Sequence, residues 1–221
     1  ENRVWEFEQI ATNTHESYQA DLIVDSNGTP HIVYVLQEIT PLGQKAIFYS
    51  TLTNGTWIST QLFNITGSAK PNIGISNSGI IGIVFEGQEN GEVSSLRLLL
   101  RQNGIWTNST LVQSDHNVET PKIIFDGDGH IHIAWLDNTG YFQGTSSRNL
   151  EYTSNQTGNW TTGTAFSGRS GDTFEISIDS QNTPHIANIA VGHDSVSDDI
   201  YHSSLSSSGW ITNNVTTQGQ W

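Results

Sequence analysis

Short runs of hydrophobic residues follow one another along the whole chain, and turn residues separate them. Residues 45–52 alternate between apolar and polar side chains, and Asn27-Gly28 and Asn54-Gly55 stand between such runs. No segment keeps the spacing of an amphipathic helix. Strands of this length, with turn signals every 8–12 residues, are typical of an all-β protein.

An internal repeat organises these strands. Its first mark is a turn followed by an apolar run, in the strings DSNGTPHIVY from Asp25, SNSGIIGIVF from Ser76, DGDGHIHIAW from Asp126 and DSQNTPHIAN from Asp179. The spacings are 51, 50 and 53 residues. Its second mark is a tryptophan with the same period, at Trp5, Trp57, Trp106, Trp160 and Trp210. Self-similarity at this period indicates a repeat architecture.

Each repeat has room for four short strands. In the first repeat the pattern predicts strands at 21–24, 31–35, 45–52 and 57–62, with a tight turn at 25–30. The Asn-Gly pairs supply the positive φ angles that a two-residue hairpin needs. A four-stranded unit of about 50 residues matches one blade of a β-propeller. The fold class is therefore all-β, a propeller of four-stranded antiparallel blades.

We expect a single domain over 1–221. Its parts are a surplus strand and loop at 1–20, then four complete blades at 21–66, 67–115, 116–167 and 168–221. The stretch Val4–Ile10 reads as a fifth copy of the fourth strand, although the last blade already has its own. Three arrangements remain: a four-bladed ring with the extra strand at its edge, which we favour, a partial propeller from a longer chain, or a strand that pairs with a neighbouring molecule.

The repeated strings and the turn-plus-tryptophan resemble secreted β-propeller repeats that are distantly similar to sialidase and Asp-box propellers. The resemblance covers nearly the whole chain, and it implies an architecture without an activity, because propellers have many functions. The Asp-box pattern itself, Ser-x-Asp-x-Gly-x-Thr-Trp, is absent. A sialidase site would need three converging arginines, and the chain has only Arg3, Arg97, Arg101, Arg148 and Arg169.

Composition excludes several classes of function. Eight Lys and Arg stand against 22 Asp and Glu, for a net charge of -14, which argues against nucleic acid as a partner. No apolar run approaches the roughly 20 residues of a membrane span. The absence of cysteine excludes disulfides, thiolate metal sites and cysteine nucleophiles.

Three histidines share one register of the repeat, His31, His132 and His185, and Gly82 takes that place in the second blade. They could form a metal site, but repeated residues usually serve the repeat itself. We therefore expect each imidazole to hydrogen-bond a neighbouring blade. Asp25, Asp126 and Asp179 open the preceding turns, where a carboxylate bonds backbone amides two residues on. The run Asp126-Gly-Asp128-Gly lacks the further ligands of a calcium loop.

Functional groups of propellers gather on the face built by two sets of loops. One set leads into strand one, and the other joins strands two and three; both are irregular in this sequence. We expect ligand binding there, by His15, Glu16, Tyr18, Asp115, His116, Asp137, Tyr141, Arg148 and Arg169. The best cation candidates on these loops are Asp194, Asp198 and Asp199, whose oxygens suit calcium as the one cofactor to consider. A solvated acidic loop is the explanation that we favour for them.

The leading functional hypothesis is an extracellular, non-enzymatic binding or adhesion module for glycan. The first alternative is a self-assembling subunit of a surface layer or filament that uses the strand Val4–Ile10. The second is a polysaccharide lyase, with His15 or His116 as base, Tyr18 or Tyr141 as acid, and an arginine that neutralises the uronate. Because the net charge opposes an anionic substrate, we favour a non-enzyme and name no catalytic residue. No carboxylate pair is singled out for glycoside hydrolysis.

Sequons and composition suggest a location at the cell surface or outside the cell. Seven Asn-x-Ser/Thr sequons mark glycosylation candidates at Asn27, Asn54, Asn64, Asn108, Asn155, Asn159 and Asn214. The expected partners are a glycan or a cell-surface protein, together with self-association.

The alternation of side chains also predicts the blade core. It comprises Val24, Ile32, Val33, Phe48, Ile75, Ile83, Phe85, Leu98, Ile124, Ile133, Trp135, Ile176 and Ile186. The four repeated tryptophans from Trp57 to Trp210 should pack between blades or on the outer strands.

Overall fold

A computed structural model describes residues 7–10, 15–38, 44–67, 69–89, 93–138, 148–168, 170–191 and 198–216. All regular secondary structure in these ranges is β-strand. The strands form four antiparallel four-stranded sheets, so the expected blade is confirmed. None of the described segments is a helix of the length and apolarity that a membrane crossing requires.

Each sheet takes its strands in chain order. Blade 1 contains β1 (His15–Val24), β2 (Pro30–Glu38), β3 (Lys45–Thr53) and β4 (Thr56–Ile65). Blade 2 contains β5 (Asn72–Ile75), β6 (Ile81–Glu89), β7 (Val93–Gln102) and β8 (Ile105–Ser114). Blade 3 contains β9 (Asn117–Phe125), β10 (Ile131–Asn138), β11 (Asn149–Ser154) and β12 (Thr161–Phe166). Blade 4 contains β13 (Ser170–Ile178), β14 (Pro184–Val191), β15 (Asp198–Ser206) and β16 (Gly209–Asn214).

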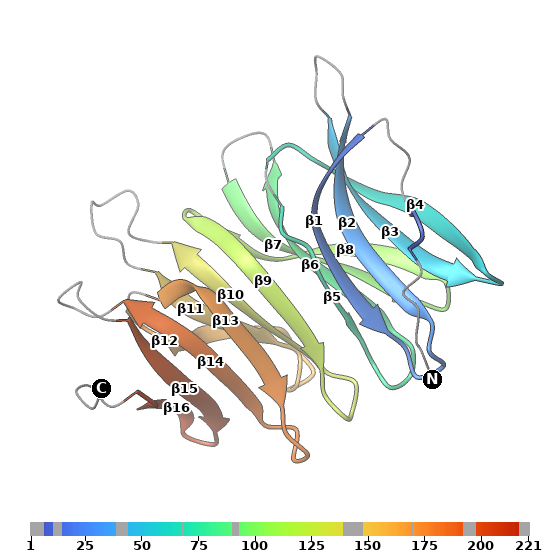
Figure 1. Ribbon diagram of the computed structural model, residues 1–221. Helices are drawn as coiled ribbons and strands as arrows, with labels where there is room; N and C mark the ends of the chain where they lie inside the picture. Colours follow the sequence, from blue (N-terminus) through green and yellow to red (C-terminus); the bar gives the residue numbers. More distant parts are fainter. Residues whose placement is uncertain are drawn as a thin grey trace.

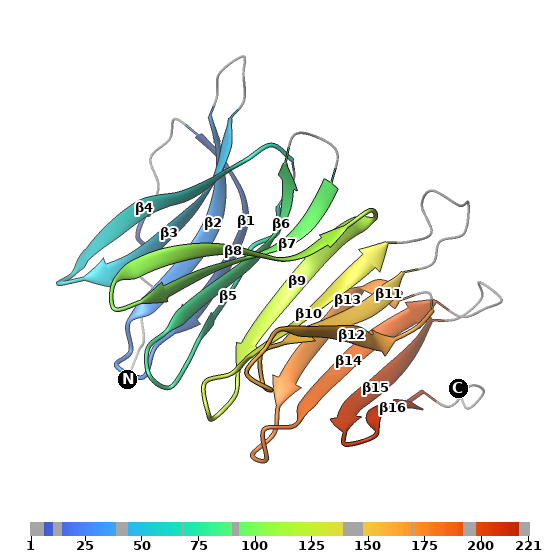
Figure 2. The same ribbon diagram turned by 180° about the vertical axis from the view of Figure 1, so that it is seen from behind.

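The four blades stand side by side in an open row. Blades 1 and 4 lie at its two ends (Figures 1 and 2), and the first strands β1, β5, β9 and β13 contact one another in sequence. The favoured closed ring of four blades is therefore wrong. Residues 7–10, the described part of the surplus strand, form no regular strand, and the exposed Glu8 accepts a hydrogen bond from Trp57 Nε1 at 2.6 Å. Val4 to Glu6 lie outside the described residues.

Three apolar cores join neighbouring blades. We call the face that a blade turns toward the following blade its forward face, and the opposite face its rear face. In each core the forward face of one blade packs on the rear face of the next. Val33 and Tyr49 of blade 1, for example, pack with Ile83 and Phe85 of blade 2. The equivalent cores join blade 2 to blade 3 and blade 3 to blade 4. Because side chains alternate across a strand, each blade contributes to two cores, except at the ends of the row.

A hydrogen-bonded chain connects the hairpin turn of a blade to its core. In blade 3, Asp126 Oδ1 accepts from the backbone N–H groups of Asp128 and His130, at 3.0 and 2.8 Å. Asp126 Oδ2 lies 3.2 Å from His132 Nε2, and His132 Nδ1 lies 2.5 Å from Tyr152 Oη. The ring of Tyr152 then packs edge-on against Trp210 of blade 4, with centroids 5.1 Å apart.

Blade 1 has the same residues, Asp25, His31, Tyr49 and Trp106, but His31 Nε2 and Asp25 Oδ2 are 3.6 Å apart, which is too far for a hydrogen bond. The histidines thus have a structural role, as expected, but the expected partner was wrong. In blades 1 and 3 the imidazole bonds a tyrosine of its own blade, and that tyrosine makes the contact with the next blade. In blade 4 the partner is a second histidine, with His185 Nδ1 and His202 Nε2 3.0 Å apart.

Blade 2 departs from the pattern for a steric reason. A Cβ atom at Gly82 would lie 2.6 Å from Ile123 Cδ1 and 3.2 Å from two ring atoms of Phe125. Blade 3 therefore fills the space that a histidine would need. Glycine in this register is a packing requirement between blades 2 and 3.

Most of the expected core residues are buried or half-buried, but Val24 is 52% exposed. This expectation was wrong because the rear face of blade 1 faces no other described blade. Of the repeated tryptophans, Trp57, Trp106 and Trp210 are half-buried, whereas Trp160 is 39% exposed and precedes β12 instead of opening it.

We expect Gly82→Ala to destabilise the protein by about 1–2 kcal/mol, because the added methyl group overpacks the interface between blades 2 and 3. The control is Gly163→Ala, where the new Cβ meets nothing within 4 Å. It should change the free energy of unfolding by less than about 0.5 kcal/mol. Urea unfolding of both variants makes the comparison, and equal stabilities would contradict the packing argument.

Candidate functional site

The two sets of irregular loops lie at one end of the strands. The first strand of each blade begins there and the second strand ends there, because the two run antiparallel. The hairpin turns that open the repeats lie at the opposite end (Figure 1). We call the first end the loop face and the second the turn face.

Near the loop face, blade 3 carries five polar side chains in two groups, which the alternation of side chains along β10 places on opposite faces of the sheet. His116 Nδ1 lies 3.5 Å from Asp137 Oδ1, and Arg148 Nη2 lies 3.6 Å from Glu119 Oε2. Asn138 Nδ2 donates to Glu119 Oε1 at 3.1 Å. These residues come from the start of β9, the end of β10, the start of β11 and the loop before β9. We name them the blade-3 cluster.

All four paired side chains of the cluster are partly exposed. The side chains of His116 and Arg148 are 37% and 29% exposed, and those of Asp137 and Glu119 are 17% and 26% exposed. His116 and Arg148 thus each lie beside a carboxylate and remain partly exposed. Such an arrangement suits neutral, hydroxylated ligands, because it fixes the direction of its hydrogen bonds before a ligand arrives.

Glu86 of blade 2 lies beneath this region. It is buried, and one carboxylate oxygen accepts the N–H of Thr120 in β9. Burial raises its pKa to about 7, the nearby charge of Glu119 adds to this, and the Thr120 N–H and the charge of Lys70 oppose it. Glu86 is therefore the described carboxyl group whose protonation changes close to neutral pH.

Burial also raises the pKa of two further carboxyl groups of blade 3. For Asp137, burial acts against the charge of His116 and its hydrogen bond, which lower the pKa. For Glu151, burial acts against the hydrogen bond from the Thr164 hydroxyl, and the charge of Asp137 raises the pKa further. The carboxyl groups under the loop face thus favour their neutral forms more than free carboxyl groups do.

A polar hollow lies beside the cluster along the first strands. Its volume is ≈ 220 Å³, and Gln19, Asn72, Lys70, Thr120 and Lys122 contribute polar lining. Asn72 is also part of a belt across the blades, since it donates to Asp21 Oδ2 and accepts from the N–H of Ile123. The belt continues from Lys122 to Glu175, 2.6 Å apart. The four side chains of the belt are spaced with the period of the repeat: Asp21, Asn72, Lys122 and Glu175. This spacing is the signal from which the sequence could have predicted the belt.

Three of the expected ligand-binding residues lie at the loop end of blade 3: His116 beside Asp137, and Arg148 beside Glu119 on the opposite face of the sheet. Asp115 is exposed on the adjoining loop. His15, Glu16 and Tyr18 belong to β1, but their side chains lie outside the described part, as do Tyr141 and Arg169 altogether. Sequence reasoning missed Asn138 and Glu151, since both belong to regular strands and neither is in an irregular loop.

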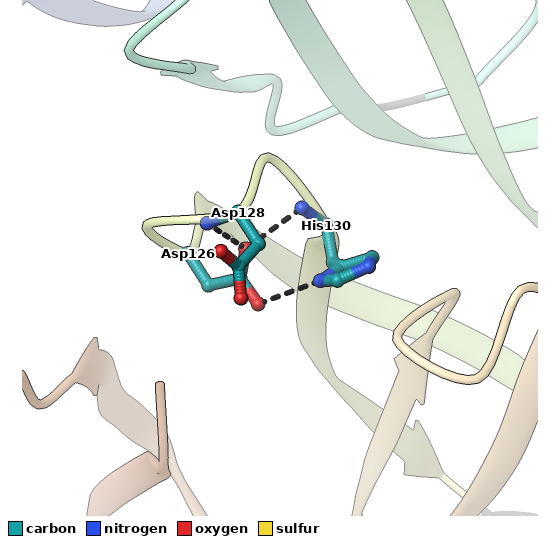
Figure 3. Close-up of side chains that lie close together, drawn as sticks. All are labelled: Asp126, Asp128 and His130. Carbon is teal, nitrogen blue, oxygen red and sulfur yellow. Dashed lines mark hydrogen bonds and ion pairs between the residues drawn. The ribbon is translucent and has the colours of Figure 1, made fainter. Parts of the chain in front are cut away.

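Of the expected cation ligands, Asp194 lies outside the described residues. Asp198 is exposed in β15, and the buried Asp199 accepts from the Thr216 hydroxyl at 3.0 Å. The described residues hold one cluster of metal-type ligands, made by Asp126, Asp128 and His130 on the turn face (Figure 3). Both oxygens of Asp126 are occupied by the turn amides and by histidines, and Asp128 Oδ2 accepts from Asn182 Nδ2. This cluster is explained by the hairpin that it holds.

Comparisons with known proteins support the fold. No protein-family model and no curated protein matches the chain. An α-L-arabinofuranosidase of Fusarium graminearum superposes with a TM-score of 0.61, at 9% identity over 94% of this chain and 69% of that one. A leech intramolecular trans-sialidase gives 0.64, at 10% identity over 98% and 54%. An ulvan lyase gives 0.58, at 16% identity over 98% and 61%.

These solved structures are β-propellers, so the chain has a propeller-type fold. It spans between about half and about 70% of their lengths. At identities of 9–16% the similarity concerns the fold alone.

The raised pKa of Glu86 predicts a pH dependence of stability. Between about pH 4.5 and 7 the folded protein retains a proton on Glu86 that the unfolded chain has lost. Stability should therefore fall as the pH rises through this window, by up to about 3 kcal/mol, and Glu86→Gln should remove this part of the decline. Urea unfolding at pH 5 and pH 7.5 measures it. Asp115→Asn, which removes an exposed carboxyl group of the same face, should decline as the wild type does.

Proposed function

We propose that the protein is a glycan-binding propeller whose ligand lies on the loop face, over the blade-3 cluster. The observation that carries this proposal is the pairing of His116 with Asp137 and of Arg148 with Glu119, whose side chains all remain partly exposed at the loop face. Sugar hydroxyl groups both donate and accept, so mixed sites of this kind match them. The propellers of similar fold include an arabinofuranosidase bound to arabinobiose and a lyase bound to a saccharide, which supports the ligand class.

A neutral glycan fits the electrostatics better than a polyanion. The charge of Arg148 is balanced by Glu119, His116 lies beside Asp137, and the chain carries a net charge of -14. A polyanion would be repelled at long range, with little local excess of positive charge to attract it. We therefore propose binding of a neutral saccharide without chemical conversion. A location outside the cell or on its surface accompanies this proposal.

The sequons agree with such a location. Asn27, Asn54, Asn64, Asn108, Asn159 and Asn214 are exposed and could carry glycans. The side chain of Asn155 is occupied, since its Oδ1 accepts from the N–H of Ile131 at 2.7 Å. We propose glycosylation at the exposed sites other than Asn27, whose side chain lines a groove on the turn face, with Asn155 as the least accessible candidate.

A glycan array tests the binding proposal, followed by titration calorimetry with the best neutral oligosaccharide. His116→Ala and Arg148→Ala should each weaken binding at least about tenfold, since each removes hydrogen bonds worth roughly 1–2 kcal/mol. Thr110→Ala, on the exposed outer strand β8, is the matched control and should bind as the wild type does. Silence across neutral glycans would contradict the proposal. Release of an unsaturated product from uronic-acid polymers would favour the lyase instead.

Self-association is a second candidate function, and the two ends of the row favour it. The rear face of blade 1 exposes Leu22 and Val24, at 54% and 52%, and the forward face of blade 4 exposes Ile200 at 43%. Every internal contact in the row joins a forward face to a rear face. We propose that blade 4 of one copy packs on blade 1 of another, a head-to-tail contact of the same type. Such contacts generate rings or filaments.

Light scattering coupled to size exclusion tests this contact. The wild type should form assemblies that grow with concentration, and Leu22→Asp and Ile200→Asp should each be monomeric, because a buried unpaired carboxylate opposes the contact. A mixture of the two variants retains one intact pair of faces and should give dimers and nothing larger. A monomeric wild type, or a mixture that stays monomeric, would exclude the head-to-tail arrangement. Ser109→Asp, on the outer strand β8, controls for the added charge.

A further inference from the structure

The hairpin turns of blades 3 and 4 are bridged by one carboxamide on the turn face. Asn182 Oδ1 accepts from the N–H of Gly127 at 3.0 Å, and Asn182 Nδ2 donates to Asp128 Oδ2 at 2.7 Å. Gly127 and Asp128 are the second and third residues of the blade-3 turn, and Asn182 is the fourth residue of the blade-4 turn. A single side chain thus fills the space between the two turns and satisfies a donor and an acceptor.

The corresponding space between blades 1 and 2 is open. Its second and third positions are Ser26 and Asn27, and the fourth position of the next turn is Gly79, which has no side chain. A groove of ≈ 400 Å³ lies there, bounded by the two turns, and its lining includes all three of these residues. An added Cβ at Gly79 would meet nothing within 4 Å, so the groove reaches the glycine itself.

The groove presents the same pair of hydrogen-bonding groups that Asn182 satisfies elsewhere. The backbone N–H of Ser26 corresponds to that of Gly127, and the side-chain oxygen of Asn27 corresponds to the Asp128 carboxylate. Within the described part of the chain, neither group has a partner in the groove, whereas the backbone N–H of Asn27 is bonded to Asp25. The N–H of Ser26 stands on a short turn held by Asp25, so its direction is set before any ligand binds, and the exposed Asn27 side chain supplies the acceptor from the same turn.

We propose that this groove binds the acetamido group of an N-acetylated sugar, which takes the place of the missing asparagine carboxamide. The acetyl C=O accepts the N–H of Ser26, and the amide N–H donates to Asn27 Oδ1. The hydroxyl group of Ser78 and the side chain of Asn77 lie along the other wall and face the ring hydroxyls, whereas the buried Ser76 hydroxyl accepts the N–H of Ile80. The half-exposed side chain of Val24 offers an apolar surface for the acetyl methyl group or the sugar ring.

The size and chemistry of the groove agree with this ligand. A volume of ≈ 400 Å³ lies within the usual range of small-molecule sites. An acetamido group is uncharged and needs no charged partner. The residues that line the groove are neutral apart from Asp25, whose carboxylate accepts hydrogen bonds from the turn amides. The site is on the turn face, at the other end of the strands from the blade-3 cluster, and it is independent of the function proposed for that cluster.

NMR titration of the unglycosylated protein with chitotriose tests the proposal. Cellotriose, which has hydroxyl groups where chitotriose has acetamido groups, is the matched control ligand. We expect chitotriose to shift the amide resonances of Ser26, Asn27 and Gly79, and cellotriose to bind at least tenfold more weakly. Equal binding of the two saccharides, or shifts confined to the loop face, would overturn the assignment.

The decisive variant is Gly79→Asn, which recreates in blade 2 the bridge that Asn182 makes in blade 4. Asparagine tolerates the positive φ of this position, as Asn182 does at 62°. The variant should fold, with a thermal midpoint no lower than that of the wild type, and should lose binding of chitotriose at least tenfold. Binding at wild-type strength in a folded Gly79→Asn would exclude the groove. His116→Ala leaves this face unchanged and should retain chitotriose binding here, which separates the two proposals.

Discussion

The hydrogen-bonded chain from Asp through His to Tyr is the interaction on which the rest of the structure depends. In blade 3 it begins at the hairpin turn, where Asp126 holds two backbone amides, and it ends at Tyr152, which packs on Trp210 of the next blade. The pKa of Asp126 is raised by burial, but the hydrogen bonds from His130 and His132 outweigh this and lower it. Burial lowers the pKa of His132. One polar chain therefore fixes the turn, the strand pairing and the contact between blades.

The exceptions to this chain show what it requires from its neighbours. Blade 2 has no such chain, because Ile123 and Phe125 of blade 3 occupy the space beside Gly82. Blade 4 has it in altered form, with His202 in place of tyrosine, and its forward face meets no further blade in the described chain. Leu22 and Val24 are exposed at the other end for the same reason. Among the described residues, the histidine–tyrosine pair is thus found only in blades 1 and 3, where the following blade supplies a tryptophan that packs on the tyrosine.

The sequence predicts the structure within each blade well and the contacts between blades poorly. Turn strings and tryptophan spacing predicted the four sheets, because a strand and its hairpin are local. The openness of the row depends on whether blades 1 and 4 meet, and no local pattern encodes that contact. The same holds for the candidate site. His116, Asp137 and Arg148 were expected from their irregular loops, whereas Glu86 reaches Thr120 across a blade interface and Asn138 lies in a regular strand.

The repeat constrains the residues of the turn face but not those of the loop face. A departure from the repeat is therefore informative only on the turn face. On the loop face, the sequence differs from blade to blade, so the polar cluster of blade 3 cannot be compared with equivalent residues in the other blades. On the turn face, the four turns share one hydrogen-bonding scheme, and Ser76 keeps it with a hydroxyl that accepts the N–H of Ile80. Against that fixed framework a single change is informative: asparagine at 182 closes the space between two turns, and glycine at 79 leaves the same space open.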